Sequence, residues 1–255
     1  MTCFGLIGFP ILQSLSVAYF TAKFQAEGLY DFHYDLFPLQ EVSGLSAIIA
    51  NNASLRGLNV TIPHKVKVIP MLHKLDAISA SVGAVNTIAI IRKADSVILE
   101  GYNTDVIGFE QSFLPLLKPG DKRALVLGTG GASKAVAYVL NNNNIPFTYV
   151  SRDPKSHDHL SYKDISGDVL AAHPIIINTT PLGKYPRTFD FPELPYELLT
   201  SAHLLYDLNY TPEITRFMQL GAARGAMVKS GLQMLHLQAD ASWDIWKRNM
   251  LPIHE

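Results

Sequence analysis

The sequence contains a single cysteine, Cys3, among its 255 residues. One thiol cannot form an internal disulfide, and Cys3 lies in an apolar run, so we interpret it as a small core residue. The nine histidines, with His33, His64 and His73 among them, show no spacing typical of metal ligands. We therefore expect neither a disulfide scaffold nor a metal site.

An excess of charge of either sign is also absent, because 21 lysines and arginines stand against 22 aspartates and glutamates. Nucleic-acid binding needs a basic excess on one face, which this balance does not support. No apolar run reaches the roughly 18 residues of a membrane span, and no secretory signal pattern is visible. We expect an unanchored cytoplasmic protein whose partner is a small molecule, with monomer and homodimer both left open.

What the chain does contain is a regular alternation of predicted strands and helices. The first half is predicted to hold strands at 3–8, 32–38, up to Pro63, in 83–90 and in 96–105, and helices at about 16–28, 41–51, 66–82 and 104–117. This alternation is typical of β-α-β units and a largely parallel sheet.

The second half continues the alternation after a change of pattern near Arg123. Four short apolar strands are predicted at 124–128, 147–152, 174–181 and 203–210. The last stretch, 230–250, has Leu235, Ala239 and Trp243 on one face and predicts a long helix. With 48% hydrophobic residues the chain can bury a sizeable core. We predict an α/β protein of two lobes with a deep crevice between them.

A glycine loop follows the first strand of the second half. Gly128, Gly130 and Gly131 lie directly after this strand and before a helix. A tight turn allows the backbone to approach a pyrophosphate closely, and the free amides of the helix N-terminus face the anion. The loop therefore favours a dinucleotide in a Rossmann-like lobe, although a glycine turn without a ligand remains an alternative.

The end of the next strand suggests which dinucleotide binds. An NAD enzyme would carry an acid here for the ribose 2′-hydroxyl, whereas this chain has Ser151 and Arg152, with Lys155 close by. A guanidinium matches a 2′-phosphate, so the sequence favours NADP. Asp153 argues the other way, since its carboxylate would repel that phosphate, and Arg152 as a surface side chain without a ligand is the alternative.

A lysine and an aspartate follow strands in the first half. Lys65 comes just after Pro63, and Asp105 lies in the first turn of a predicted helix. Taken singly, Lys65 fits a solvated surface charge and Asp105 fits helix capping or dipole pairing. Both belong to one lobe, together with short polar side chains at strand ends: Asn59, Thr61 and Asn86. This set suits a substrate rich in hydroxyls and a Lys-Asp pair that manages a proton.

Eight motifs in order carry a resemblance to a known family. They are "GFPILQSLS", "LNVTIPHK", "GAVNT", "GYNTDVIG", "GTGGASKA", "INTTPLG", "YDLNYTP" and "GLQMLHLQA". In this order they resemble shikimate dehydrogenase over nearly the whole chain. The resemblance implies reversible NADPH-dependent reduction of 3-dehydroshikimate to shikimate, in the pathway to chorismate and the aromatic amino acids.

The resemblance also implies the roles of particular residues. Lys65 and Asp105 match the catalytic pair. The residues expected to bind substrate are Ser14, Ser16, Asn59, Thr61, Asn86, Tyr210 and Gln238. The residues expected to bind NADP are Gly128, Gly130, Gly131, Ala132, Ser151, Arg152, Lys155, Thr179 and Gly231. The substrate-binding lobe is expected to comprise 1–102 plus 233–255, and the NADP-binding lobe 103–232.

Two alternatives to this function remain. Leu15 and Val17 lie beside the two serines, at positions where the family commonly has polar residues or proline. The preference for shikimate over quinate is therefore in doubt. A paralogue that uses quinate or NAD is the first alternative. A dinucleotide-sensing protein without catalysis could share the fold, but it has no need for Lys65 with Asp105. We expect Lys65 to carry the larger share of proton transfer and Asp105 to orient it.

Overall fold

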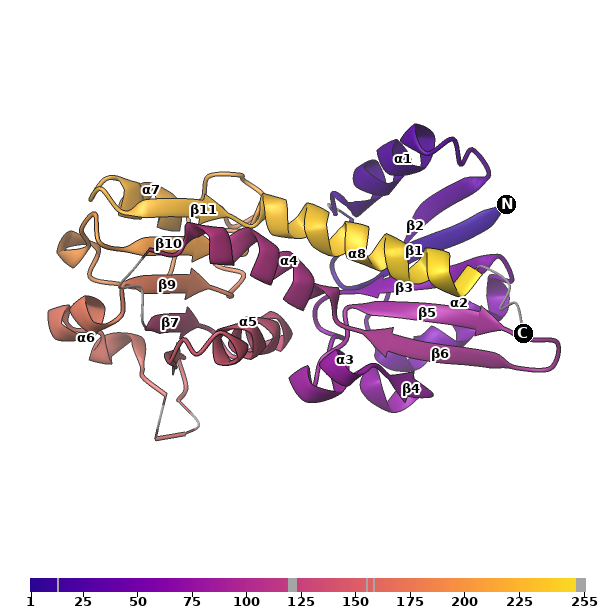
Figure 1. Cartoon of the computed structure of the whole chain (residues 1–255), viewed down its shortest axis with the longest axis horizontal. Coiled ribbons are helices and arrows are strands. Elements are labelled where there is room, and N and C mark those ends of the chain that lie inside the picture. The colour runs from indigo at the N-terminus through magenta and orange to yellow at the C-terminus, as the bar shows by residue number, and fades with distance from the viewer. Residues whose placement is uncertain (13, 119–122, 155, 158, 251–255) are drawn as a thin grey trace. The chain divides into compact units, whose positions relative to one another are not determined.

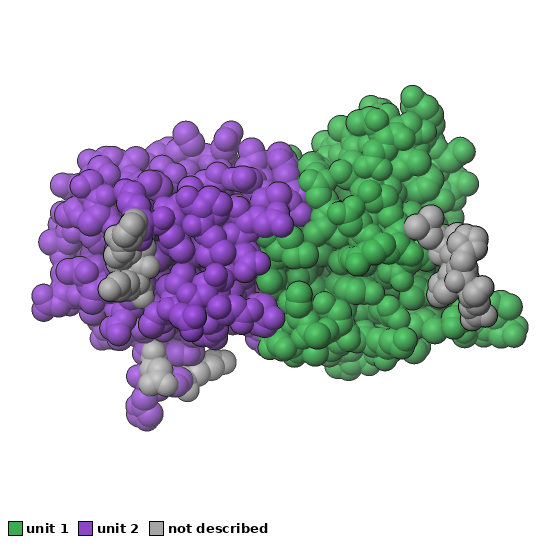
Figure 2. All heavy atoms as spheres, in the orientation of Figure 1, with its two compact units in different colours: residues 1–107, 238–255 green, residues 108–237 purple. Residues whose placement is uncertain are grey.

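A computed structural model describes residues 1–250 except 13, 119–122, 155 and 158. The chain forms two compact units, shown in Figure 2: unit 1 comprises residues 1–107 and 238–255, and unit 2 comprises residues 108–237. The boundaries expected from the sequence lie a few residues earlier, because the units change within helices α4 (Thr104–Phe113) and α8 (Leu232–Met250). Among the described residues, no helix is long and apolar enough to span a membrane.

Unit 1 is built on a six-stranded sheet with the order β2-β1-β3-β5-β6-β4. Its strands are β1 (Thr2–Gly8), β2 (Phe32–Pro38), β3 (Leu55–Val60), β4 (Lys74–Leu75), β5 (Thr87–Arg92) and β6 (Val97–Tyr102). The prediction of a largely parallel sheet is wrong in part, because β5 runs antiparallel to both β3 and β6. A tight turn in which Lys93 N donates to Ser96 O joins β5 to β6, and only antiparallel neighbours allow so short a connection.

Helices cover both faces of this sheet (Figure 1). Helix α1 (Ser16–Ala26) and the C-terminal part of α8 pack on one face, where Phe20, Phe24, Trp243 and Trp246 form an aromatic core. Helix α2 (Leu45–Asn51) contributes to the core of the opposite face. The aromatic core ties α8 to strands that precede it by more than 150 residues, and so brings the end of the chain back to unit 1.

The predicted helix over 66–82 is wrong for most of its length. A one-turn 3-10 helix with Pro70 in its first turn, and then strand β4, occupy 69–75. Only α3 (Ala77–Val82) is helical, and it starts at Asp76, whose side chain accepts a hydrogen bond from Ser79 N. A proline in a helix interior and an N-cap this late both stop a continuous helix.

Unit 2 contains a five-stranded parallel sheet with the order β11-β10-β9-β7-β8. The strands are β7 (Ala124–Leu127), β8 (Phe147–Val150), β9 (Ile175–Asn178), β10 (Leu204–Asp207) and β11 (Met227–Ser230), and the helices are α5 (Gly131–Asn142), α6 (Gly167–Ala172) and α7 (Arg216–Ala222). Four of these strands were predicted, and β11 was missed. Its residues "MVKS" carry a weak apolar signal.

The strand order of unit 2 has a topological switch point. The chain leaves β7 for β8 on one side and returns to β9 on the other, so the carboxyl ends of β7 and β9 meet without a crossover helix between them. Doubly wound sheets of this kind bind ligands at that point. Gly128 follows β7 and Thr179 follows β9, so two expected cofactor residues lie there.

Candidate active site

Lys65 and Asp105 form a short ion pair in unit 1. Lys65 Nζ lies 2.5 Å from Asp105 Oδ2, and the two side chains are only 14% and 7% exposed. Lys65 follows the turn after β3, and its backbone carbonyl accepts a hydrogen bond from Val85 N. Since exposed lysines rarely have such partners, the interpretation of Lys65 as a solvated surface charge is wrong.

The Asp105 carboxylate does not cap helix α4. Asn103 Oδ1 accepts a hydrogen bond from Val106 N and so serves as the cap, while Asn103 Nδ2 donates to Ala84 O. Asp105 lies in the first turn, as predicted, but its two oxygens accept from Lys65 and from Asn86 Nδ2, the latter at 2.8 Å. Asp105 therefore orients these two side chains in addition to favouring the positive end of the helix.

Asn86 lies at the centre of a buried polar network. Its Nδ2 lies within hydrogen-bonding distance of Asp105 Oδ1, Thr104 Oγ1 and Gln238 Oε1, at 2.8, 3.0 and 3.3 Å. Its Oδ1 accepts from Thr104 N at 2.7 Å and from Thr87 Oγ1 at 3.1 Å. The network thus connects the catalytic candidates with Gln238 on α8.

Asn59 joins the same network from β3. Its Nδ2 donates to Ser242 Oγ at 2.9 Å and to Thr87 Oγ1 at 3.2 Å, and its Oδ1 accepts from Tyr34 OH at 2.8 Å. Both polar atoms of the Asn59 amide therefore already have hydrogen-bond partners within the protein. Thr87 and Ser242 were not predicted as site residues, although Thr87 follows Asn86 directly and Ser242 lies one helical turn after Gln238.

The two serines expected to bind substrate, Ser14 and Ser16, lie together at the start of α1. Ser14 Oγ donates to Ser16 Oγ at 3.0 Å, and Ser16 N donates to Ser14 Oγ at 3.2 Å. The Thr61 side chain is half-buried, and its hydroxyl has no hydrogen-bond partner among the described residues. The Ser16 and Thr61 hydroxyls therefore keep a proton that can be donated to a ligand.

The glycine loop of unit 2 has the backbone that close approach to an anion requires. Gly128 has a φ of +97°, and a Cβ there would lie 2.9 Å from Thr180 Cγ2 and 3.0 Å from Thr179 Oγ1. Gly130 precedes α5, and a Cβ there would meet no atom within 4 Å. Gly131 and Ala132 form the first turn of α5, whose free amides suit a pyrophosphate. The space above Gly130 and the helix N-terminus thus fit a dinucleotide.

Alanine is expected to affect different properties at Gly128 and at Gly130. Gly128→Ala is expected to destabilise the fold by about 2 kcal/mol, because a side chain at positive φ is strained and two threonines crowd it. Gly130→Ala is expected to leave thermal unfolding unchanged but to weaken NADP binding about tenfold or more. Thermal unfolding and NADP titration of both variants check this. Unchanged NADP affinity in Gly130→Ala would contradict a pyrophosphate at this loop.

The turn after β8 carries the expected ribose-phosphate residues. Ser151 Oγ is fixed within the turn, where it accepts from Asp153 N at 3.2 Å. Arg152 and Asp153 are exposed, and neither forms an ion pair with the other or with any other residue that the structure describes. The guanidinium is therefore not neutralised by its neighbour. Lys155 lies outside the described residues.

Two further expected residues, Thr179 and Gly231, and the neighbouring Lys184 lie in unit 2. Thr179 Oγ1 donates to Leu127 O at 2.6 Å and links the ends of β9 and β7. Lys184 Nζ lies 5.8 Å from the centroid of the Tyr210 ring, so this lysine does not point away from the expected substrate residue. Gly231 is buried, and a Cβ there would overlap the backbone of Leu208. Glycine is thus required at 231 by packing alone.

A buried carboxylate that was not predicted from the sequence, Asp207, organises the loops after β9 and β10. Asp207 Oδ1 accepts from Asn178 Nδ2, Asn209 N and Asn209 Nδ2, each at 3.0 Å, and Oδ2 accepts from Thr215 Oγ1 at 2.5 Å. Asn209 Nδ2 also donates to the carbonyl of Leu182. Burial raises the pKa of Asp207 to about 6, against the opposing effect of these four donors.

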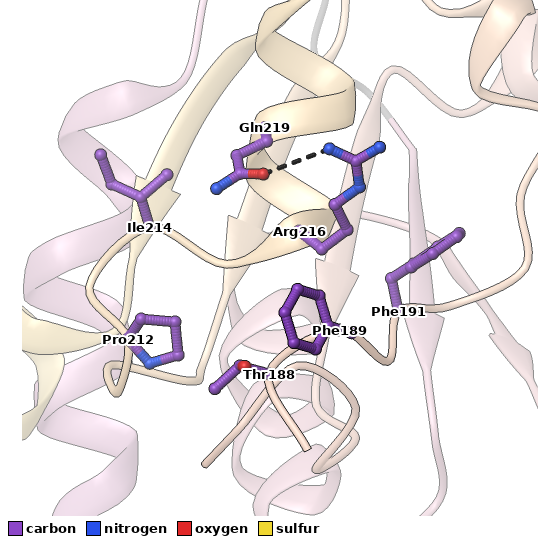
Figure 3. Close-up of a pocket in the computed structure, with 7 residues that line it drawn as sticks. All are labelled: Thr188, Phe189, Phe191, Pro212, Ile214, Arg216 and Gln219. Carbon is purple, nitrogen blue, oxygen red and sulfur yellow. Dashed lines mark hydrogen bonds between the residues drawn. The ribbon is translucent and has the colours of Figure 1, made fainter. Parts of the chain in front are cut away.

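A pocket of about 620 Å³ lies elsewhere in unit 2 (Figure 3). Its lining comprises Thr188, Phe189, Phe191, Pro212, Ile214, Arg216 and Gln219. In the close-up Arg216 points toward Gln219 and donates to its Oε1 at 3.3 Å. None of the residues expected to bind substrate or cofactor lines this pocket, so its size carries no weight in assigning the chemistry.

Comparisons with known proteins agree with the site. A family model described as the shikimate dehydrogenase substrate binding domain matches residues 6–88. A shikimate dehydrogenase (NADP(+)) from Moorella thermoacetica is 34% identical over 270 residues, which cover 98% of this chain and 89% of that protein.

Two solved structures share the fold over 97% of this chain and 94% of each structure. Shikimate 5-dehydrogenase from Thermus thermophilus, in complex with NADP(H) and shikimate, is 27% identical with a TM-score of 0.83. Quinate dehydrogenase from Corynebacterium glutamicum, in complex with NAD, is 25% identical with a TM-score of 0.82. The predicted two-lobed α/β class is confirmed, and the chain belongs to the shikimate dehydrogenase family.

Proposed function

We propose that this protein is an NADP-dependent shikimate dehydrogenase, which reversibly reduces 3-dehydroshikimate to shikimate in aromatic amino acid biosynthesis in the cytoplasm. The observation that carries the proposal is the buried pair of Lys65 and Asp105. A protein that only senses a dinucleotide has no use for a lysine held at 2.5 Å by a buried carboxylate. An oxidoreductase acting on an alcohol needs a group that exchanges the hydroxyl proton.

Lys65 is the proton-transfer group in this proposal. In the direction of oxidation Lys65 accepts the proton of the C3 hydroxyl of shikimate at Nζ in its neutral amine form and becomes an ammonium. In reduction this ammonium returns the proton to the same oxygen. One carboxylate oxygen of Asp105 accepts a hydrogen bond from Lys65 and the other accepts one from Asn86. Asp105 therefore orients Lys65 in this proposal and does not itself exchange the substrate proton. The positive charge of Lys65 also stabilises the alkoxide that develops as the C3 hydrogen leaves.

Other residues of unit 1 bind the substrate. The paired hydroxyls of Ser14 and Ser16 suit its carboxylate, and the Thr61 hydroxyl and the Gln238 amide suit its ring hydroxyls. Asn59 acts by holding the network in place, since its amide is already bonded to Tyr34, Thr87 and Ser242. Tyr210, on unit 2, is the remaining expected substrate contact.

Residues of unit 2 bind NADP. The glycine loop and the N-terminus of α5 hold the pyrophosphate, and Ser151 and Arg152 hold the 2′-phosphate. NADP supplies the hydride acceptor, and NADPH the donor. Gly231 packs closely against the backbone of Leu208, next to the expected position of the nicotinamide. A side chain at 231 would push the two backbone segments apart.

Initial rates with shikimate and with quinate, each measured with NADP and with NAD, test the function. We expect the combination of shikimate and NADP to give the highest kcat/KM. Protein that binds NADP but oxidises neither alcohol would contradict the proposal and favour a dinucleotide sensor.

A second candidate function is a dehydrogenase that prefers quinate or NAD. Similarity to a quinate dehydrogenase solved with NAD favours it, as do the exposed Asp153 carboxylate and the apolar side chain of Leu15 between the two serines. The same four rates decide between the candidates, because a higher kcat/KM for quinate or for NAD would establish the second one.

Arg152 is expected to set the preference for NADP. Arg152→Ala removes the guanidinium that pairs with the 2′-phosphate, so KM for NADP is expected to rise at least tenfold while KM for NAD changes less than twofold. Arg224→Ala, which removes another exposed arginine of unit 2, is the matched control. Equal rises in KM for NADP and NAD would show that Arg152 does not contact the 2′-phosphate.

A further inference from the structure

Three side chains with metal-binding atoms lie together at the edge of the unit 1 sheet. Cys3 belongs to β1, and His33 and Asp35 belong to β2, which is the edge strand. One ligand atom of each, the Cys3 thiol among them, lies within 4.8 Å of the other two. The cluster was not anticipated from the sequence, in which 29 residues separate Cys3 from His33.

Strand pairing creates this cluster. Cys3 is the register partner of His33 in the parallel pair of β1 and β2, and Asp35 lies two residues beyond His33. Because side chains alternate between the faces of a sheet, all three point to one face. Phe4 and Tyr34 belong to the opposite face, which α1 and α8 cover and where Asn59 joins the polar network. The cluster is therefore separate from the candidate active site.

The two distances to the Asp35 carboxylate fit tetrahedral coordination. Cys3 Sγ lies 3.6 Å from Asp35 Oδ2, and His33 Nε2 lies 3.4 Å from the same oxygen. Typical zinc bonds of about 2.3 Å to sulfur and about 2.0–2.1 Å to nitrogen or oxygen, at tetrahedral angles, place such ligand atoms about 3.5 Å and about 3.4 Å apart. Both measured distances therefore match a tetrahedral site, and the third pair of ligand atoms, from Cys3 and His33, lies within 4.8 Å.

Charge and access also suit a cation. The Asp35 carboxylate forms no ion pair with any lysine or arginine that the structure describes. The side chains of Asp35 and His33 are 53% and 33% exposed, so water can reach the cluster as a fourth ligand, while Cys3 is buried behind them. His33 Nδ1 is buried without a partner among the described residues.

We propose that Cys3, His33 and Asp35 bind a divalent cation of the zinc class, with water completing a tetrahedral site. Thiolate, imidazole and carboxylate together are typical zinc ligands. Binding requires the Cys3 thiol to lose its proton to solvent, and no electron transfer takes place. The cation links the edge strand β2 to β1 and stabilises unit 1, because a ligand that binds the folded state shifts the unfolding equilibrium.

Cadmium titration of the purified full chain tests the proposal. Cd²⁺ bound to a thiolate absorbs in the near ultraviolet, and since the chain has one cysteine, any such band reports Cys3. We expect a band that saturates at one equivalent, disappears in Cys3→Ser, and needs at least tenfold more Cd²⁺ in His33→Ala and in Asp35→Asn. Both of these replace partly exposed side chains, so they keep the test valid if Cys3→Ser folds poorly.

The matched control is Asp31→Asn, which neutralises another exposed carboxylate close to the same strand. It should titrate like the wild-type protein, and Zn²⁺ should raise the unfolding temperature of both but not of His33→Ala. The proposal is overturned if folded protein gives no band. It is overturned equally if the band is unchanged in both His33→Ala and Asp35→Asn, since Cd²⁺ would then bind the thiol alone.

Discussion

Lys65→Ala is expected to lower kcat for shikimate oxidation about 1000-fold while KM for shikimate changes less than about threefold. A loss of this size corresponds to roughly 4 kcal/mol of transition-state stabilisation. The reason is that the lysine acts on the proton of the reacting hydroxyl, whereas the carboxylate and ring hydroxyls of the substrate bind elsewhere. Steady-state kinetics at saturating NADP measure both constants.

Two controls separate the chemistry of Lys65 from its structural role. Removing Lys65 leaves Asp105 buried with one partner, Asn86, so Lys65→Ala is also expected to lower the free energy of unfolding by about 3 kcal/mol. Kinetics must therefore be compared at temperatures where the variant is folded. Lys67→Ala removes an exposed lysine two positions away and should change neither constant. Near-normal turnover in folded Lys65→Ala would remove Lys65 from the mechanism.

Asp207→Ala is expected to lower the free energy of unfolding by about 3 kcal/mol or more. The substitution leaves four buried donors, on Asn178, Asn209 and Thr215, without their acceptor, and each unsatisfied donor costs about 1–3 kcal/mol before relaxation. Chemical denaturation measures the effect. Asp168→Asn changes a carboxylate of the same unit that lies far from this cluster in the sequence, in the first turn of α6, and should alter stability by less than about 0.5 kcal/mol.

The raised pKa of Asp207 also implies that the stability of the protein depends on pH. This pKa is raised to about 6 in the folded state, against about 3.9 in an unfolded chain. Between these values the folded state keeps a proton that the unfolded state has lost, so this contribution to stability is complete below about pH 4 and is lost as pH rises through 6.

The neutral isostere Asp207→Asn lacks this titration. The stability of the wild-type protein relative to Asp207→Asn should therefore fall as pH increases from about 4 to about 6, and then level off. A difference that stays flat or rises over this range would mean that the four donors outweigh burial and keep the carboxylate ionised.

Strong local patterns in the sequence identified most of the fold and the chemical class. The apolar runs of β7, β8, β9 and β10 lie between turn residues, and Gly128, Gly130 and Gly131 follow directly after β7, so strand, loop and helix were all predicted locally. The eight ordered motifs led to the family, which similarity over 98% of the chain confirms. Strand β11 was missed because its residues carry little pattern of their own, and it forms by pairing with β10.

Only the tertiary structure decided which polar side chains meet. The sequence could not distinguish Asp105 as a helix cap from Asp105 as a partner of Lys65, because both fit the first turn of a helix, and the contact bridges 40 positions. The antiparallel course of β5 and the replacement of the predicted helix at 66–82 likewise depend on neighbouring strands and on Pro70. Thr87 and Ser242 are unremarkable locally and become part of the network only when α8 packs on the sheet.

The same holds for Cys3, His33 and Asp35. Each fits an ordinary core or surface residue in the sequence, and the register of β1 with β2 brings the three together. Local pattern thus determined the elements and the family of this protein, because propensity and periodicity act over a few residues. Long-range packing decided the networks, because hydrogen bonds and ligand sites depend on distances in space that spacing along the chain does not encode.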